Sequence, residues 1–161
     1  MNIKIKEASL NDFRVLILFR LLLLKHDFEL DETMPYNIEK IQKSVRYMNN
    51  YLKKEDNKYF IAYHNNLPMG YLHVTYDNKK NKTSSYISEL YVLDLYRSKG
   101  IGKGLVSFQL KYLKKIKITE NTLTTTKYKN QRTINFYKKL GYKLNKENKG
   151  KNIIYLSKKL I

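Results

Sequence analysis

Residues 87–113 constrain the fold of this chain more than any other segment. They read ISELYVLDLYRSKGIGKGLVSFQLKYL: an apolar strand, a turn that contains several glycines, and an amphipathic helix. The first N–H groups of a helix are free and carry partial positive charge, and glycines there let the backbone approach a phosphate closely. The segment therefore predicts an anion-binding loop at residues 97–104, between a buried strand and a helix.

Three phosphate-binding patterns compete for this loop. A Walker A loop requires an earlier glycine and a following Ser or Thr, but Gly102-Lys103 is followed by Gly104. A dinucleotide fingerprint, GxGxxG, requires a different final spacing of the glycines. The third pattern, R/Q-x-x-G-x-G/A, is matched in full by Arg97, Gly100 and Gly102.

The remaining sequence indicates one mixed α/β domain that spans residues 1–161. Hydrophobic residues make up 42% of the chain, which is enough for a core, and no linker or repeat divides it. Periodicity and turn signals predict the element order β-α-α-β-β-β-α-β-α-β-β. We expect strands at 2–8, 58–64, 69–76, 85–93, 122–126, 142–145 and 152–160, and helices ending near 25, 52, 115 and 140.

The first predicted helix is apolar on more than one face. Its apolar run, residues 15–24, is interrupted by Arg20 and is shorter than the about 20 residues that a membrane span requires. Acidic residues precede it and no small-residue cleavage site follows, so it is a poor signal peptide. We therefore expect a soluble, cytoplasmic protein in which this helix is either deeply buried or in contact with a partner subunit, as in a homodimer.

Charge and cysteine content narrow the function classes. The net charge is +18, which invites a nucleic-acid-binding interpretation. However, only 5 of the 32 basic residues are arginine, the side chain best suited to bidentate phosphate contacts, and the lysines are spread along the chain. We favour solvated lysines that attract a small anionic ligand. The absence of cysteine excludes disulfides, a thiol nucleophile and zinc-thiolate sites, and we expect no metal.

Two blocks of the sequence resemble the GNAT superfamily of acyl-CoA-dependent N-acyltransferases. The first, ELYVLDLYRSKGIGKGL at 89–105, is similar to the family's central strand, pyrophosphate loop and helix. The second, at 130–142, is similar to the family pattern N-x5-[FLY]-Y-x-K-x-G-[FY]. The resemblance implies a single GNAT-like domain: a mixed central sheet of about seven strands, splayed at the central strand and flanked by four helices.

The resemblance also implies a binding site for acetyl-CoA. A bulge splays the strand at 85–93 from the strand at 122–126, and pantetheine pairs with backbone exposed in the gap. Amides of the loop hold the pyrophosphate, with lysines adding charge. Asn130 could contact the cofactor, but capping of the helix that follows explains an asparagine at this position equally well. The cofactor-binding residues implied by position are Leu90, Tyr91, Val92, Arg97, Ser98, Lys99, Gly100, Ile101, Gly102, Lys103 and Asn130.

The resemblance places Tyr137 at the family's tyrosine position, where it would protonate the departing thiolate. The N–H of Val92 would stabilise the tetrahedral oxyanion. With 15 tyrosines in the chain, a packing role for Tyr137 is the alternative. The identity of the general base that would deprotonate the amine is not decided by the resemblance. Thr125 stands where many relatives have glutamate, and a threonine cannot serve as this base. Glu89 is the main candidate, with His73, a water relay and a purely structural Glu89 as alternatives.

An acidic cluster bears on the acceptor. It would favour a cationic amine such as an aminoglycoside, a polyamine or a lysine-bearing peptide, and the alternative is a solvated loop. We predict an N-acetyltransferase whose primary-amine acceptor attacks acetyl-CoA directly in a ternary complex. The competing predictions are a catalytically silent acyl-CoA-binding module and a basic nucleic-acid-binding protein. The predicted substrate-binding residues are Asp27, Glu29, Asp31 and Glu32.

Overall fold

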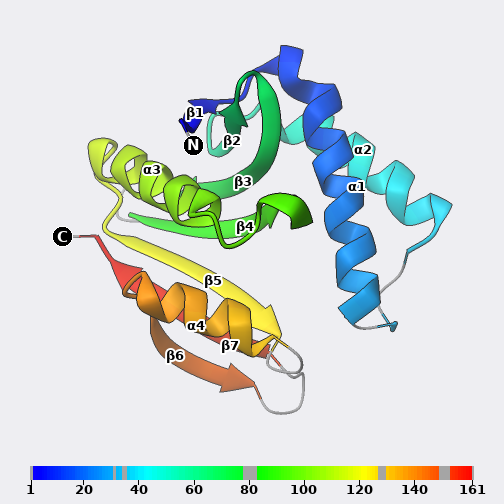
Figure 1. Ribbon diagram of the computed structural model, residues 1–161. Helices are drawn as coiled ribbons and strands as arrows, with labels where there is room; N and C mark the ends of the chain where they lie inside the picture. The colour runs from blue at the N-terminus through cyan, green and yellow to red at the C-terminus, as the bar shows by residue number, and fades with distance from the viewer. Residues whose placement is uncertain are drawn as a thin grey trace.

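The chain folds around one mixed sheet of seven strands, in the order β1-β2-β3-β4-β5-β7-β6 (Figure 1). The computed structural model describes residues 2–30, 32–33, 36–77, 83–126, 130–148 and 153–160. The strands are β1 (Lys4–Glu7), β2 (Asn57–His64), β3 (Leu67–Asp77), β4 (Ser84–Val92), β5 (Glu120–Thr126), β6 (Lys143–Asn148) and β7 (Ile153–Lys159). The α-helices of the described residues are α1 (Phe13–Leu30), α2 (Ile38–Tyr51), α3 (Ile101–Lys115) and α4 (Gln131–Lys139). The predicted single mixed domain of seven strands and four helices is confirmed.

Two hydrophobic cores lie on opposite faces of the sheet, because side chains alternate along each strand. In β3, Leu72 joins the core that α3 and α4 cover, which includes Leu105 and Ile134. Its neighbour Tyr71 joins the second core with Phe19 of α1 and Met48 of α2. In Figure 1, α3 and α4 accordingly lie on one face of the sheet, with α1 and α2 on the other.

The first helix differs from its prediction. It extends to Leu30, and of its residues Leu16, Phe19 and Leu24 are buried, whereas Leu18 is 54% exposed. Deep burial of the whole helix is therefore wrong, and an apolar outer face remains on the surface. Among the described residues, no helix combines the length and apolarity needed to cross a membrane.

The central strand separates from its successor, as predicted. Strands β4 and β5 pair in parallel only where Ser84–Tyr86 lies beside Glu120–Thr122. Beyond these residues the two strands diverge, as Figure 1 shows. A bulge in β4 lies at the start of the divergence, because His73 pairs with Glu89 and Val74 pairs with Ile87, which leaves Ser88 as the extra residue. We call the space between the diverging strands the fork.

Candidate active site

Backbone groups of β4 face the fork. The amide of Leu93 donates to the carbonyl of Met69 at 2.9 Å, so Leu93 forms a hydrogen-bonded pair with β3. Such pairs alternate along an antiparallel ladder. The peptide groups of Tyr91 therefore face β3, while those of Leu90 and Val92 face the fork. A ligand in the fork would find free amides at these two residues.

The loop after β4 opens toward the same side of the sheet. A short 3-10 turn, Asp94–Tyr96, leads to Gly100, which precedes α3 in the left-handed conformation at φ 83°. A side chain at Gly102 would place its Cβ 3.4 Å from the ring of Phe136, whereas one at Gly100 would meet open space. The space beside Gly100 is therefore open, and the first amides of this 15-residue helix have no acceptor within the helix, as at any helix start. Such a cradle fits a diphosphate.

Basic side chains surround this loop in different roles. The Arg97 guanidinium donates from Nε to the Val92 carbonyl at 3.0 Å and pairs with Asp94 at 2.7 Å. Its side chain therefore fastens the loop to the end of β4. The ammonium of Lys99 lies 5.4 Å from the ring centre of Tyr96, and Lys103 is exposed on the first turn of α3.

Arg132 also reaches this loop, although sequence reasoning did not single it out. It donates from a terminal guanidinium nitrogen to the Ser98 hydroxyl at 2.8 Å, so α4 contributes a cation beside the proposed phosphate cradle. The available signal in the sequence was its position two residues after Asn130, in the second block. The sequence did not indicate that the first turn of α4 lies beside the loop, because that proximity arises only on folding.

A polar network holds the closed end of the fork together. The Tyr142 hydroxyl donates to Asn121, whose amide donates to the Ser85 hydroxyl at 2.9 Å. On the opposite face of the sheet, the hydroxyls of Tyr86 and Thr124 lie 2.5 Å apart and bridge β4 to β5. These side chains fix the point at which the strands separate. Sequence reasoning missed them because each contact joins residues more than 20 positions apart.

Tyr137 lies on α4 with its ring in the first core, 4% exposed. Among the described residues, its hydroxyl has no hydrogen-bond partner. Burial raises the pKa of Tyr137 above its usual value, and the nearby Tyr86 hydroxyl raises it further. The phenol is therefore protonated at neutral pH and can donate its proton.

Asn130 precedes α4 and ties it to β5. Its side-chain amide donates to the Thr125 hydroxyl at 2.7 Å, while its carbonyl accepts from the Ile134 amide at 3.1 Å. The Asn130 side chain makes no capping hydrogen bond to the helix. The contact with Thr125 is thus a structural role that the sequence did not suggest.

Glu89 lies on the α1/α2 face of β4, and both of its carboxylate oxygens are engaged. One pairs with Arg20 at 2.7 Å, and the other accepts from the Tyr71 hydroxyl. The side chain of Glu89 is only 14% exposed. These contacts agree with a structural, salt-bridged role for Glu89, which was the alternative to its role as the base. The carboxylate nevertheless borders a hollow. His73 is buried against Tyr59, and burial lowers its pKa to about 3, so it is a weak base.

The hollow beside Glu89 has a volume of about 370 Å³ and lies under α2. Burial raises the pKa of Asp27, and the charges of Arg20 and Lys40 oppose that rise, which places Asp27 among the same groups. The hollow is lined by Arg20, Lys40, Lys43, Ser44, Tyr47, Met48, Tyr51, Tyr59 and Glu89.

The four acidic residues predicted to bind substrate do not share one environment. Asp27 lies near the Glu89 hollow, whereas Glu29 and Glu32 are exposed and Glu29 lies 3.8 Å from Lys25 on the same helix. Asp31 lies outside the described residues.

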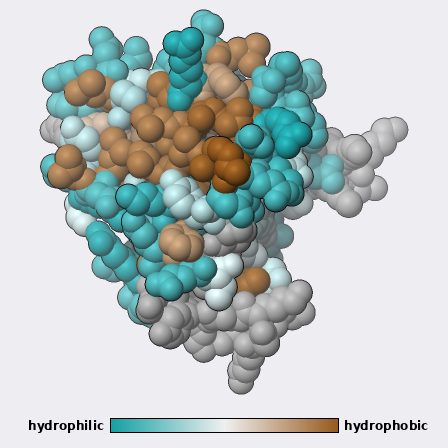
Figure 2. Space-filling view, turned by 90° about the vertical axis from the view of Figure 1, so that its right-hand side faces the viewer, coloured by the Kyte–Doolittle hydropathy of each residue, from teal (hydrophilic) through white to brown (hydrophobic). Residues whose placement is uncertain are grey.

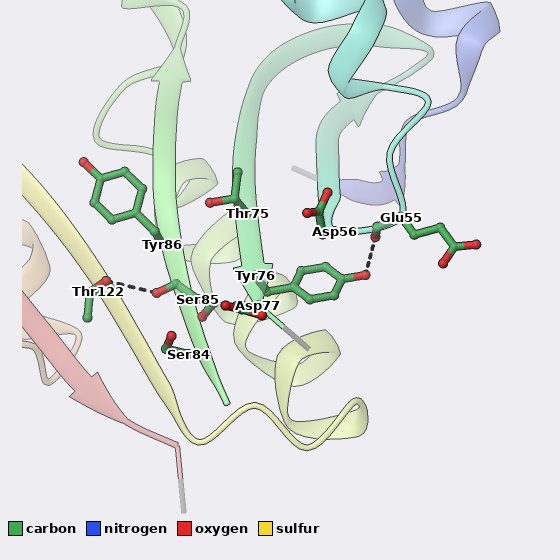
Figure 3. A pocket seen from close by; sticks show the side chains of 9 residues that line it. All are labelled: Glu55, Asp56, Thr75, Tyr76, Asp77, Ser84, Ser85, Tyr86 and Thr122. Atoms are coloured by element: carbon green, nitrogen blue, oxygen red, sulfur yellow. Dashed lines mark hydrogen bonds between the residues drawn. The ribbon is translucent and has the colours of Figure 1, made fainter. Parts of the chain in front are cut away.

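A second hollow, of about 620 Å³, lies at the closed end of the fork. Figure 3 shows Tyr86 and Thr122 on one side of it and Asp56 and Glu55 on the other, with Asp77 between them. The lining includes these three acidic residues and no lysine or arginine among the described residues, and the Glu55 side chain points away from the others in Figure 3. In a chain of net charge +18, this is a locally acidic surface.

Comparison with known proteins places this geometry among acetyltransferases. The sequence model described as the acetyltransferase (GNAT) family matches residues 23–142. The fold is similar to that of the PaiA N-acetyltransferase from Thermoplasma acidophilum in complex with coenzyme A, with a TM-score of 0.77, 22% identity and 99% of each chain covered.

Two further structures show the same fold at lower identity. An acetyltransferase of the GNAT family from Staphylococcus aureus has a TM-score of 0.77 at 18% identity, over 99% of this chain and 100% of the other. The ribosomal-protein-S18-alanine N-acetyltransferase from Escherichia coli has a TM-score of 0.71 at 12% identity, over 99% of this chain and 94% of the other.

Proposed function

This chain belongs to the acetyltransferase (GNAT) family, and we propose that it transfers the acetyl group of acetyl-CoA to a primary amine by direct attack in a ternary complex. The observation that carries the proposal is the continuity of the fork with the loop at 97–104. Fork-facing amides at Leu90 and Val92 lead from buried Tyr137 to the open first turn of α3. One elongated ligand, with a diphosphate at one end and a thioester at the other, would occupy both the loop at 97–104 and the fork.

The donor would bind mainly through backbone. Amides of residues 98–102 would hold the diphosphate, Lys99 and Lys103 would add charge, and the fork-facing backbone of Leu90 would pair with the pantetheine arm. The Arg97 guanidinium bonds the Val92 carbonyl and Asp94, and the Arg97 amide donates to the Asp94 carbonyl at 3.2 Å, so Arg97 would act mainly by holding the loop in place. Arg132 would add a cation from α4.

The transfer step assigns one task to each group. The neutral amine attacks the thioester carbon, and the Val92 amide stabilises the negative charge that forms on the oxygen. The C–S bond then breaks while the Tyr137 hydroxyl protonates the sulfur. The proton lost by the amine would pass through water to Glu89 or to solvent, and Tyr137 would regain its proton from solvent.

The acceptor is proposed to be a cationic amine that enters beside the closed end of the fork. The acidic residues Asp56 and Asp77 in the lining of the larger hollow support this, because an ammonium group gains from nearby negative charge. Asp27 and Glu89 would add negative charge from the neighbouring hollow. Glu29 lies on the outer face of α1 and contributes less to this argument.

A catalytically silent acyl-CoA-binding module is the second candidate. It is favoured by Thr125 at the family's glutamate position and by a Glu89 carboxylate that Arg20 and Tyr71 already engage. Such a module would bind acetyl-CoA through the same loop but would not depend on Tyr137.

The first test is acetyl-CoA binding. It is measured by calorimetry and by the rise in melting temperature that any native-state ligand causes. Gly102→Val should abolish the shift, since the new side chain would crowd Phe136 and block the cradle. Lys111→Val, on the exposed side of the same helix, is the matched control and should bind normally. No binding by the unaltered chain would refute the proposal.

Turnover is the second test. Released thiol should be measured with aminoglycosides, polyamines, amino acids and peptides as acceptors. Acetylation of a polyamine or another cationic amine supports the proposal. Tight acetyl-CoA binding with no turnover across all four classes supports the silent module instead.

A further inference from the structure

We propose that the outer face of α1 joins two copies of this chain into a two-fold symmetric dimer. Residues 15–19 and 21–24 of the helix are apolar, but among them only Leu16, Phe19 and Leu24 are buried. Leu18 is 54% exposed, and neither Leu18 nor Leu21 belongs to the core clusters of the described residues, whereas Leu22 is partly buried and packs against the second core on one side. Figure 2, which views the α1/α2 side, shows a broad apolar patch bordered by hydrophilic side chains. A patch of this kind on a monomer marks an interaction site.

The outer face is one stripe with an ordered charge pattern. At about 100° per residue, its members project within roughly a quarter turn of one another. The stripe begins with a cation, continues with three leucines and a lysine, and ends with an anion. Its members are Arg14, Leu18, Leu21, Leu22, Lys25 and Glu29.

This order complements itself when two copies pair antiparallel. With the two-fold axis between Leu21 and Leu22, each residue meets the partner residue whose number sums with its own to 43. Leu21 then packs on the partner subunit's Leu22, and Leu18 packs along the methylene stem of the partner's Lys25. Arg14 faces the partner subunit's Glu29 at both ends of the interface, as a self-complementary surface requires.

Two other arrangements of the same helices oppose like charges. A shift by one turn sets Arg14 against the partner subunit's Lys25. Parallel pairing sets Arg14 against the partner's Arg14 and Glu29 against the partner's Glu29. The existing pair between Lys25 and Glu29 does not prevent the antiparallel arrangement, because both side chains are more than half exposed at a distance of 3.8 Å. Exposed pairs of this kind contribute little to stability.

Neighbouring apolar groups enlarge the surface. Phe28 near the end of α1 stacks with Tyr36 at 6.0 Å between ring centres, and both side chains remain at least one-third exposed. Ile38 at the start of α2 is 70% exposed. A stable dimer buries roughly 1,200 Å² or more in total, so the interface would have to include these side chains as well as the helix stripe.

The test measures mass by light scattering and sedimentation at about 150 mM salt, over roughly 1 to 100 μM protein, a range suited to an interface of this size. The unaltered chain should be a dimer. Leu21→Asp should weaken the dimer at least about tenfold, because it places a carboxylate in the apolar centre, against the partner's Leu22. Leu67→Asp changes a leucine that is 61% exposed at the start of β3 and should leave the dimer intact.

Charge reversal tests the register. Arg14→Glu alone and Glu29→Arg alone should each weaken the dimer, since like charges then meet at both ends. The double variant R14E/E29R should restore it, with melting temperatures confirming that all three variants are folded. A monomeric unaltered chain, a dimer that survives Leu21→Asp, or a double variant no better than the single ones would overturn the proposal. None of these outcomes depends on acetyl transfer, which is measured separately.

Discussion

At the scale of single residues, Tyr137 is the side chain whose environment suits a proton donor. Its ring is packed in the core beside Tyr142 and Phe136, which fixes its direction. Burial raises the pKa of Tyr137, so the hydroxyl stays neutral across the physiological range. A neutral phenol is the correct protonation state for donation to a departing thiolate.

Tyr137→Phe should therefore lower turnover about 100-fold while acetyl-CoA affinity stays nearly constant, because only the transition state uses the proton. Steady-state kinetics and calorimetry on the same preparation separate the two effects. Tyr155→Phe, at a partly exposed tyrosine of β7, is the control and should retain activity. Equal turnover in the Tyr137 variant would make Tyr137 a packing residue.

Asp12 is a second residue whose environment makes a measurable prediction. Burial alone would raise its pKa, but hydrogen bonds from Ser9, Lys6 and Tyr63 outweigh burial and lower the pKa to about 2. The carboxylate thus joins the turn before α1 to β1 and β2. A lowered folded-state pKa stabilises the fold above the unfolded value of 3.8, and this stability is lost as pH falls toward 2.

Asp12→Asn should therefore lower the free energy of unfolding at pH 7 by about 2 kcal/mol. The difference from the unaltered chain should shrink when urea unfolding is repeated from about pH 4 down to about pH 2, because Asp12 becomes protonated over this range and loses its charge. Glu39→Gln, in an exposed pair with Lys43, should change stability little at either pH. A difference independent of pH would contradict the assigned hydrogen bonds.

At the scale of elements, the fork depends on how its closed end is held. Parallel strands β4 and β5 share only a short ladder, so side chains supply much of the connection. Asn121 is fully buried and links Tyr142 to Ser85. Buried polar groups that lose a partner cost about 1–3 kcal/mol each.

Asn121→Leu should accordingly destabilise the protein by roughly 2 kcal/mol or more, because the hydroxyls of Tyr142 and Ser85 lose their shared partner. Chemical denaturation measures the change. The same substitution at Asn49, exposed on α2, should stay within about 0.5 kcal/mol of the unaltered chain. Equal effects at the two sites would mean that the network adds no stability.

At the scale of the whole molecule, the net charge of +18 acts at long range on any anionic ligand. We expect acetyl-CoA affinity to fall several-fold between about 50 and 500 mM salt, because the Debye length shortens from roughly 14 to 4 Å. Lys103→Gln should reduce this salt dependence, whereas Lys4→Gln, on β1, should not. Calorimetry at several salt concentrations gives both slopes. Nucleic-acid binding that is tight at physiological salt and insensitive to acetyl-CoA would revive the competing function.

The sequence by itself determined most helices and strands and the loop at 97–104. Local signals sufficed there: Asn37 caps α2 by accepting from the Lys40 amide, Asn65 and Asn66 take positive φ in the β2–β3 turn, and Gly100 starts α3. Each is a short-range preference that neighbouring residues reveal. The resemblance in the two blocks added the sheet and its splay.

Only the tertiary structure decided what surrounds each candidate group. It paired Glu89 with Arg20, brought Arg132 to Ser98, and separated inward Asp27 from exposed Glu29. It also left Leu18 on the surface. Contacts between residues distant in sequence depend on how strands and helices pack, and no local pattern encodes that packing. The apolar residues of α1 show the difference: their periodicity predicts a helix, but which side faces water depends on a sheet formed by residues 57–92.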